Sequence, residues 1–480
     1  MQTQLQVLSD DERSLVHELT LNLLSTSGLR VDTPGGRNIL SEAGAQVDEL
    51  TSMVRLPRAL IESALKAAPR QFRLGGRLPG WSFPVNQGDC TLLADGGAVF
   101  TFDFQSNQNR LATFEDWQKA TRLIDTLDEV GIYWAMVQPT FAEGSFGNLV
   151  AYWGNIFRNF SKHVQDCPYT PEGSRWMLEV LQVIFNGKEA VQRFKPVSFL
   201  LNPLSPLVIE AAPTDAYLET LGWDIPVAVM PMPMMGSTAP ASLLSTLVQA
   251  NCEVLAMLCL IQAAAPGTPV LYAPAPTVME LHSGRFAGGE IEHALLGAAV
   301  TEMGRFYGLP VQASTGGSGS PIPGLQAGYE RALNWALPAL SWPDILVGPG
   351  LLGGSLSLCL EQLLIDVEVF RRCRRLHCGV SRADAKGLVE EIQTIGPGAD
   401  FLAQRSTRDA VRKGEWYISK VGVNTSLEGW QANDRPELLP SLREEISHIL
   451  AAYQPLELDE TVEQELASLE KRARENNQVG

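Results

Sequence analysis

Basic charge is the first thing that this sequence has little of. Its 480 residues contain 37 Lys and Arg against 54 Asp and Glu, which gives a formal net charge of −17 at pH 7. A surface that binds a phosphate backbone needs clustered Lys and Arg. The charge balance therefore argues against a nucleic-acid partner.

Long apolar runs, a leader sequence and a disulfide framework are also missing. No run of about eighteen apolar residues is present that could span a bilayer, so no membrane partner is expected. The opening MQTQLQVLSDDER has neither the basic nor the apolar part of a signal peptide, and the seven cysteines are odd in number and scattered. These observations predict a reduced, cytoplasmic protein.

Metal-binding and catalytic motifs are absent as well. Cys373, His377 and Cys378 form the one local Cys/His group, and no second pair completes four zinc ligands, so no metal site is expected. There is no nucleophile elbow, no paired-carboxylate signature, no HExxH and no GxxxxGK[ST]. Hydrolysis and phosphoryl transfer are therefore disfavoured, and no catalytic residue can be named.

What the sequence does contain is a repeated alternation of short apolar runs and helical patterns. Near-continuously apolar strands separated by amphipathic segments are typical of a parallel sheet covered by helices. Because no GxGxxG opens the first helix, the pattern predicts an α/β (β/α)8 TIM barrel, with an unclear eighth strand near residues 376–380. Seven strands are predicted at 132–137, 163–167, 197–201, 226–232, 269–273, 310–314 and 345–347.

The flanking parts of the chain differ from this alternation. Residues 1–112 are predicted to form a small α+β region, whose Phe-rich stretch 98–104 suggests a hairpin over one end of the main domain. Residues 113–425 are assigned to the barrel. Residues 426–480 turn charged and are predicted to be a helical tail on the surface.

The stretch GLPVQASTGGSGSPIPGLQAGYER, residues 308–331, is the most informative part of the barrel. A strand ends in a glycine-rich loop and then enters a helix. Glycines at a strand's carboxyl end allow a ligand to approach the backbone, and in such folds this end holds the ligand. An ordinary connection between a strand and a helix is the alternative.

Residues near the other predicted strand ends are poor in acids and bases and rich in Met, Pro, Gly and aromatic side chains. Aromatic faces attract a cation by about 0.5 to 2 kcal/mol each, which suits a quaternary ammonium ligand, although aromatic residues at strand ends are also common in cores. The predicted pocket residues are Tyr133, Trp134, Tyr152, Tyr272, Gly316, Gly317 and Tyr329, and the predicted polar positioning residues are Gln138, His163, Asn202, Gln326 and Glu330.

A series of short motifs in order along the chain resembles the trimethylamine methyltransferase (MttB) superfamily. The motifs are GLRV at 28–31, AGAQVD at 43–48, VRLP at 54–57, APRQF at 68–72, GSTAP at 236–240, QANCEVLA at 249–256, PGTPVLY at 266–272, QAGYE at 326–330 and IGPG at 395–398. The resemblance implies a (β/α)8 barrel that demethylates methylated amines.

The resemblance also implies a partner. Members of the superfamily pass the methyl group to the cobalt of a separate corrinoid protein, so cobalamin is expected on that partner and not bound permanently here. The founding enzymes contain pyrrolysine, which this chain lacks. It is thus similar to the branch acting on quaternary amines such as glycine betaine, proline betaine or carnitine, in which a neutral tertiary amine leaves without a general acid. A homo-oligomer is also expected.

One departure from the family pattern leaves the substrate open. Where relatives tend to carry charged residues after the sixth strand, this chain has the uncharged loop GSGSP at 317–321. Two alternatives therefore stand beside the quaternary-amine hypothesis. One is a methyltransferase that uses a sulfonium or other methylated donor, and the other is a non-catalytic binder of quaternary ammonium compounds.

Overall fold

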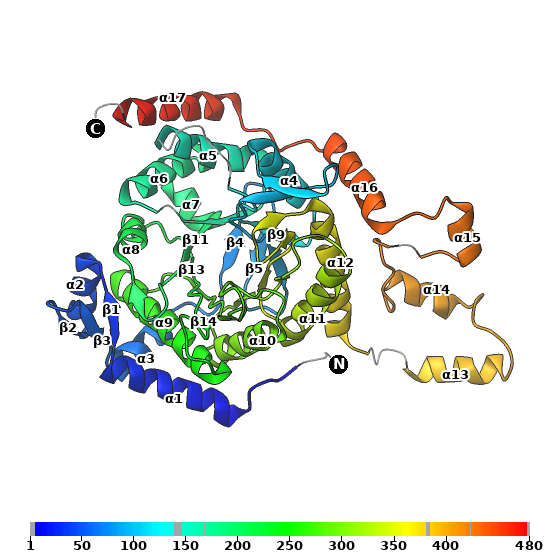
Figure 1. The fold of residues 1–480 in the computed structure, drawn as a ribbon, viewed down its shortest axis with the longest axis horizontal. Coiled ribbons are helices and arrows are strands. Elements are labelled where there is room, and N and C mark those ends of the chain that lie inside the picture. The colour runs from blue at the N-terminus through cyan, green and yellow to red at the C-terminus, as the bar shows by residue number, and fades with distance from the viewer. Residues whose placement is uncertain (1–4, 139–145, 168, 381–384, 423, 478–480) are drawn as a thin grey trace.

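A closed barrel of eight parallel strands lies at the centre of the molecule (Figure 1). The computed structural model describes residues 5–138, 146–167, 169–380, 385–422 and 424–477. Each strand pairs in parallel with the next, and a bridge between Tyr272 and Val311 joins the two ends of the row. The strands, in order around the barrel, are β6 (Thr91–Leu93), β9 (Val130–Tyr133), β10 (His163–Asp166), β11 (Val197–Leu201), β13 (Val227–Val229), β15 (Val270–Tyr272), β17 (Gln312–Ser314) and β18 (Ile345–Val347). The predicted (β/α)8 barrel is confirmed.

The first strand of this barrel is one that the sequence pattern did not reveal. The prediction of a strand near residues 376–380 is wrong, because α12 (Leu360–Cys378) continues through most of that segment. The missing strand is β6, a three-residue stretch that pairs with β18 and β9. So short a run has no periodicity of its own, and its partners are far away in the sequence. The glycine-rich loop therefore follows the seventh strand and not the sixth.

Helices surround the barrel on all sides (Figure 1). Local sequence explains several of their starts: Thr113 and Asp116, for example, form a capping box at the start of α4. The helices along this part of the chain are α4 (Phe114–Thr126), α5 (Phe146–Asn159), α6 (Pro171–Phe185), α7 (Lys188–Phe194), α8 (Ala211–Leu218), α9 (Leu243–Ala264), α10 (Ile291–Phe306), α11 (Leu325–Ser341) and α12.

One of these helices, α9, is long and apolar enough to cross a membrane by length and composition alone. It is the single such helix in the described part of the chain. Its apolar character has another cause, since 83% of its most apolar window is buried inside the protein. Buried residues such as Leu255 and Leu258 belong to the main hydrophobic core.

The amino-terminal end of the barrel is closed by a hairpin of β4 (Arg73–Gly75) and β5 (Ser82–Pro84). Leu74 and Phe83 from this hairpin belong to the same buried cluster as the inward-facing barrel residue Leu200. Above this floor, the side-chain amides of Gln165 and Gln312 exchange two hydrogen bonds of 3.0 Å across the barrel. The floor is therefore packed shut, and a ligand can enter only from the carboxyl end, the mouth.

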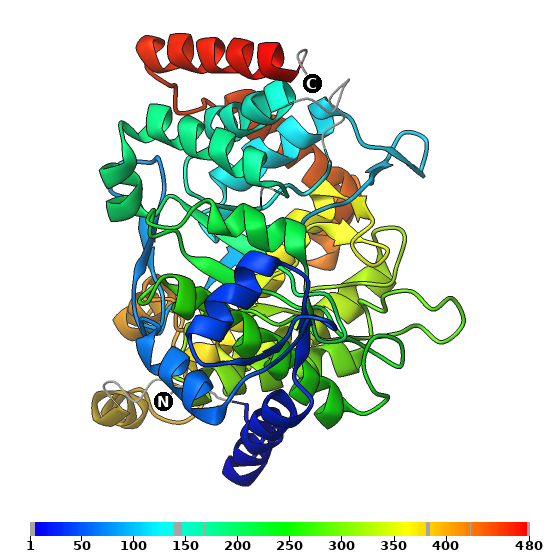
Figure 2. The same cartoon turned by 90° about the vertical axis from the view of Figure 1, so that its left-hand side faces the viewer.

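Loops and short strands surround the mouth, and they extend to the right in Figure 2. The strands β7 (Phe100–Asp103) and β8 (Gln108–Leu111) form a hairpin that contains part of the Phe-rich stretch. This hairpin pairs with β20 (Ser357–Leu358), which is itself paired with β19 (Leu351–Leu352). A second small sheet joins β14 (Met234–Met235) to β16 (Thr277–Val278).

The amino-terminal region consists of α1 (Asp10–Thr26), β1 (Leu29–Val31), α2 (Pro34–Glu42), β2 (Gln46–Asp48), β3 (Met53–Arg55) and α3 (Arg58–Ala67). Its sheet also takes in β12 (Val208–Ile209) from the barrel part of the chain, through a parallel pairing with β1. The division at residues 112 and 425 remains a prediction, but β6, the first barrel strand, lies within the range 1–112.

The carboxyl-terminal part contains α13 (Ala385–Ile395), α14 (Arg405–Arg412), α15 (Leu427–Ala432), α16 (Leu438–Ala452) and α17 (Glu460–Asn477). Although α17 is rich in charge, it has a buried stripe of Leu466, Leu469 and Ala473 that belongs to the main core. An ion pair of 2.5 Å between Arg158 and Glu463 also links it to α5. This last helix is thus part of the folded body.

Candidate functional site

The alternation of side chains along each barrel strand decides which residues can face a ligand. Ile132, Leu200, Leu271 and Val347 share one buried cluster inside the barrel, so the residues next to them in the sequence point outward to the helices. This parity separates the predicted site residues into two groups. A predicted site residue that lies two positions after an inward-facing residue points to the mouth. A residue that lies only one position after it points outward to the helices.

Tyr133 and Tyr152 are wrong as pocket residues, because both lie between the sheet and the helices. The Tyr133 hydroxyl accepts a hydrogen bond of 2.9 Å from the Trp117 indole. The Tyr152 hydroxyl donates one of 2.7 Å to Asp166 at the end of β10. Burial raises the pKa of Asp166 to about 6. These groups attach α4 and α5 to the barrel wall.

Tyr272 is also wrong as a pocket residue. It follows the inward-facing Leu271, so its fully buried ring points to the outside of the barrel. Its hydroxyl donates a hydrogen bond of 2.8 Å to Asn251 on α9. Its ring centroid lies 6.0 Å from that of Tyr307. Its role is to pack α9 and the end of α10 against β15.

His163 lies at the wrong end of the barrel to contact a substrate at the mouth. It begins β10, and its Nδ1 lies 3.0 Å from the carbonyl of Gly75 in the floor hairpin. Because a carbonyl can only accept, Nδ1 carries the proton and Nε2 accepts from the Ser198 hydroxyl at 2.9 Å. Burial lowers the pKa of His163 to about 4, so the ring is neutral. The prediction of a polar positioning residue is therefore corrected to a floor residue.

Trp134 and Asn202 lie at the mouth, where their predicted roles in the pocket stay predictions. Each is two positions beyond an inward-facing residue, Ile132 and Leu200 respectively, and each is half-buried. The Trp134 ring lies against Gly96, where an added Cβ would come within 2.4 Å of it. The side-chain carbonyl oxygen of Asn202 is buried and has no partner among the described residues. Gln138 is exposed, and its backbone N–H donates a hydrogen bond to the carbonyl of Ala98.

Gly316 and Gly317 permit close packing of protein against protein, so the prediction that they admit a ligand is not supported by their surroundings. A Cβ on Gly316 would come within 1.9 Å of the Trp335 indole nitrogen. A Cβ on Gly317 would come within 2.5 Å of the carbonyl of Gly288. Any larger residue at either position would have to move α11 or the loop before α10.

Glu330 supplies a negative charge to the uncharged glycine-serine loop. One carboxylate oxygen accepts hydrogen bonds from the Ser318 hydroxyl at 2.7 Å and from the Gly319 N–H at 3.0 Å. The other accepts from the Gln326 amide at 2.8 Å. Glu330 and Gln326 thus hold the loop in place, while Tyr329 is exposed on the rim of the mouth.

The main residue that the sequence pattern missed is Asp95. It lies two positions beyond the inward-facing Leu93, so the alternation places it at the mouth beside Trp134. Its carboxylate accepts hydrogen bonds from the Ser355 hydroxyl at 2.6 Å and from the Gly96 N–H at 2.9 Å. Burial is the largest influence on its pKa, which is raised above the ordinary value for Asp. Asp95 therefore adds an acid to a mouth that is expected to be poor in acids and bases.

No periodic signal marks β6 in the sequence, so sequence reasoning does not place Asp95 at the end of a barrel strand. The one signal that could have found it is the sequence Thr-Leu-Leu-Ala-Asp-Gly-Gly at 91–97, a short apolar run ending in an acid and glycines. That pattern matches the carboxyl end of a barrel strand as well as it matches a turn.

A buried ion pair lies behind this part of the mouth. Arg331 on α11 and Asp366 on α12 are 3.3 Å apart and almost fully buried. Asp366 also accepts a hydrogen bond of 2.7 Å from the Gly350 N–H, and Arg331 donates to the carbonyl of Gly348. These contacts fix the loop after β18, whose hairpin carries Ser355. The positive charge of Arg331 also partly opposes the rise in the pKa of Asp95.

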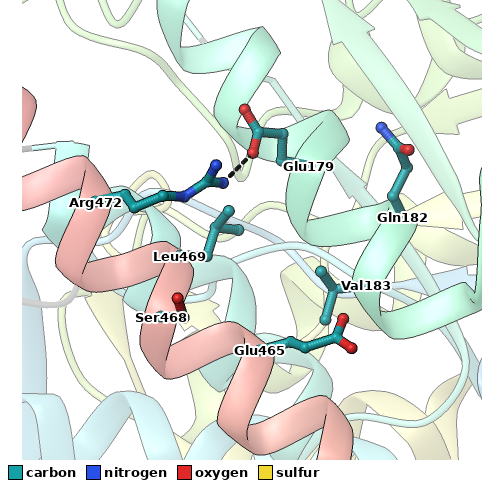
Figure 3. A pocket seen from close by; sticks show the side chains of 7 residues that line it. All are labelled: Glu179, Gln182, Val183, Glu465, Ser468, Leu469 and Arg472. Atoms are coloured by element: carbon teal, nitrogen blue, oxygen red, sulfur yellow. Dashed lines mark hydrogen bonds and ion pairs between the residues drawn. The ribbon is translucent and has the colours of Figure 1, made fainter.

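Other hollows and clusters offer less for chemistry. In the described part of the chain, no group of three or more His, Cys, Asp or Glu residues could hold a metal ion. A groove of about 360 Å³ lies between α6 and α17, with Glu179, Glu465 and Arg472 along its sides (Figure 3). It is on the outer surface of the helical layer, remote from the strand ends.

Fold and mouth together define the class: a (β/α)8 barrel whose mouth, at the carboxyl ends of its strands, carries a carboxylate and an indole ring just after two neighbouring strands. Residues 1–477 match the sequence profile of trimethylamine methyltransferase (MTTB). The chain belongs to this family, which confirms the resemblance drawn from the motifs, and it is an enzyme of the methyltransferase class.

Individual relatives are similar along nearly their whole length. Trimethylamine methyltransferase MttB of Desulfitobacterium hafniense is 30% identical over 464 residues, covering 96% of this chain and 92% of that protein. The MttB of Methanosarcina barkeri is 28% identical over 484 residues, with 98% and 95% covered. Glycine betaine methyltransferase of Desulfitobacterium hafniense is 26% identical over 472 residues, with 98% and 97% covered.

A solved structure supports the fold independently. The monomethylamine methyltransferase of Methanosarcina barkeri superposes with a TM-score of 0.52 at 11% identity, covering 93% of this chain and 89% of that one. Similarity at this level of identity shows the shared barrel. Family membership supports methyl transfer from methylated amines in general.

Proposed function

We propose that this enzyme takes a methyl group from a quaternary amine such as glycine betaine and transfers it to the Co(I) of a corrinoid held by a separate protein. The observation that carries the proposal is that Asp95 and Trp134 follow two neighbouring strands, β6 and β9, and that each lies two positions beyond an inward-facing residue. A carboxylate attracts the fixed positive charge, and an indole face accepts the methyl groups around it.

The residues at the mouth suit the departure of a neutral amine. When a methyl group leaves a quaternary ammonium, the remaining tertiary amine is uncharged and needs no proton. The enzyme must therefore bind and orient the substrate and exclude water. Asp95 and Trp134 would hold the cationic group, and the unpaired carbonyl of Asn202 could accept a hydrogen bond from a polar part of the ligand.

The corrinoid would supply the nucleophile that accepts the methyl group. Its carrier must reach the mouth, and the rim provides a surface for contact with another protein. Large apolar side chains are exposed in four of the connections that follow barrel strands, at Met232, Leu281, Leu356 and Leu325, the first residue of α11. Exposed apolar surface at the rim suits contact with another protein.

A methyl-transfer assay tests the proposal. The enzyme is mixed with reduced corrinoid protein and, in turn, glycine betaine, proline betaine, carnitine and trimethylamine, and the absorbance of methyl-Co(III) is followed. We expect methylation with at least one quaternary amine and a large fall in kcat/KM with Asp95→Asn. Methylation by trimethylamine alone, or by none of the four when a control enzyme is active, would sink the proposal.

A sulfonium donor is the second candidate, because Asp95 and Trp134 would bind a trivalent sulfur cation by the same attraction. Adding dimethylsulfoniopropionate to the panel separates the two: methylation by the sulfonium but by no amine selects the sulfonium. Calorimetry with the same compounds covers the remaining alternative. Tight binding of a quaternary amine without turnover would identify a non-catalytic binder.

A further inference from the structure

The segment of residues 385–435, here named the arm, stands away from the barrel at the right of Figure 1. It carries α13, α14 and α15, and no residue of α14 or α15 is buried. Large apolar side chains are nevertheless exposed along it, at Val389, Ile392, Leu402, Trp416, Ile418 and Leu427. The described part of the chain leaves these side chains uncovered, so a second surface is needed to bury them.

The arm is a structured element with a defined base. The Tyr417 and Ser419 hydroxyls bond to Glu368 on α12, which attaches the segment to the body. Within the arm, the Ser406 hydroxyl donates a hydrogen bond of 2.7 Å to Glu391, which holds α14 to α13. A segment that is fixed at its base and internally bonded can present a surface to a partner without folding anew.

Charge indicates what that partner surface is like. The arm contains seven Lys or Arg and seven Asp or Glu, so the net charge of −17 belongs to the rest of the chain. Within α14, Arg405, Arg408 and Arg412 recur at helical spacing with Asp409 as the one acid, which gives the helix a charge of +2. A positive helix on an acidic protein is complementary to other copies of the same protein.

The groove between α6 and α17 offers an acidic, hollowed surface of suitable kind (Figure 3). Val183 and Leu469 contribute apolar surface to it, and Glu179 and Glu465 lie along its sides. A second hollow adjoins it, shares Glu179 and Arg472, and adds Glu172, Glu475 and Arg175. Arg472 forms an ion pair with Glu179. Counted together, the two hollows are lined by two more acidic residues than arginines.

We propose that the arm of one molecule docks, through α14 and its neighbouring apolar residues, into the α6–α17 groove of a second copy of this chain. In Figure 1 the arm lies at the right and α17 at the upper left, so the two surfaces are on different sides of the molecule. An interface between unlike surfaces is head-to-tail, and it forms a ring when the rotation closes. This assembly is independent of the methyl-transfer reaction.

Two charge-reversal variants test the docking. The arm variant is Arg405→Glu/Arg408→Glu/Arg412→Glu, and the groove variant is Glu172→Lys/Glu465→Lys. A matched control reverses three exposed cations elsewhere, in Lys66→Glu/Lys119→Glu/Arg285→Glu. Light scattering after gel filtration gives the mass of each protein, and circular dichroism confirms that each is folded.

The wild type and the control are expected to be oligomers, and each interface variant should self-associate about 10- to 100-fold more weakly, because several charge pairs become repulsive. Mixing the two interface variants should produce dimers, since one intact arm and one intact groove remain. A monomeric wild type, or an arm variant with the wild-type mass, would overturn the proposal. So would an oligomeric arm variant that loses only its reaction with the corrinoid protein, because the arm's partner would then be that protein.

Discussion

Replacing Asp95 by Asn removes one negative charge from the mouth while keeping the size of the side chain. The Asn oxygen can still accept a hydrogen bond from Ser355 or Gly96, so the loop should keep its shape. What changes is the attraction between the carboxylate and a bound cation. The substitution therefore separates recognition of charge from packing.

The size of the effect follows from Coulomb's law. Methyl groups keep the ammonium nitrogen about 5 Å from the carboxylate, and at an effective dielectric constant of about 20 the attraction is about 3 kcal/mol. Losing 2 to 3 kcal/mol of it should raise KM for a quaternary amine about 30- to 150-fold. Because the ammonium charge fades as the methyl group leaves, the carboxylate favours the bound substrate over the transition state. Hence kcat should stay the same or rise while kcat/KM falls.

Steady-state kinetics of Asp95→Asn, with Asp103→Asn on the outer hairpin as the matched control, measures this effect. In 3,3-dimethylbutanoate an uncharged tert-butyl group replaces the trimethylammonium group of glycine betaine, and this compound, tested as an inhibitor, should not bind Asp95→Asn more weakly than it binds the wild type. The raised pKa of Asp95 also predicts the direction of the pH dependence. The affinity of the wild type for the cation should fall as the pH drops through that pKa, because the carboxylate becomes protonated. An unchanged KM for the quaternary amine in Asp95→Asn would refute the assignment of Asp95.

Three further changes separate the mouth from the barrel wall and floor. Trp134→Ala should raise KM for the quaternary amine about 2- to 30-fold, because the cation–π contact is lost. Tyr329→Ala, on the rim, should leave KM unchanged, and equal effects of the two variants would contradict the placement of Trp134 at the mouth and Tyr329 on the rim. His163→Ala should lower the free energy of unfolding by about 2 to 4 kcal/mol in a denaturant titration, because it deletes a buried, hydrogen-bonded ring. Kinetics should show little change in kcat/KM of the folded fraction. The pKa of Asp166 is raised to about 6 in the folded protein, so its contribution to stability is full below its unfolded value of 3.8 and is lost as pH rises through 6. Asp166→Asn should remove up to about 3 kcal/mol of this pH dependence, and an unaltered stability profile between pH 4 and 7 would count against it.

The sequence by itself determined the architecture. Seven of the eight barrel strands can be recognised in the sequence as short runs between helical patterns, and most of these runs are apolar because their strands are buried on both faces. Caps such as Thr113 mark helix starts by purely local hydrogen bonds. The family likewise could be predicted from short motifs in order along the chain, and the family comparison confirms it.

Only the tertiary structure decided which side chains face the mouth. Tyr133 and Trp134 are adjacent in the sequence and equally aromatic, yet strand parity sends the first outward to Trp117 and the second inward beside Asp95. A shift of one residue in register would exchange them, and no local signal fixes that register. Asp95 itself depends on β6, a strand of three residues that exists because β18 and β9, distant in the sequence, pair with it on both sides.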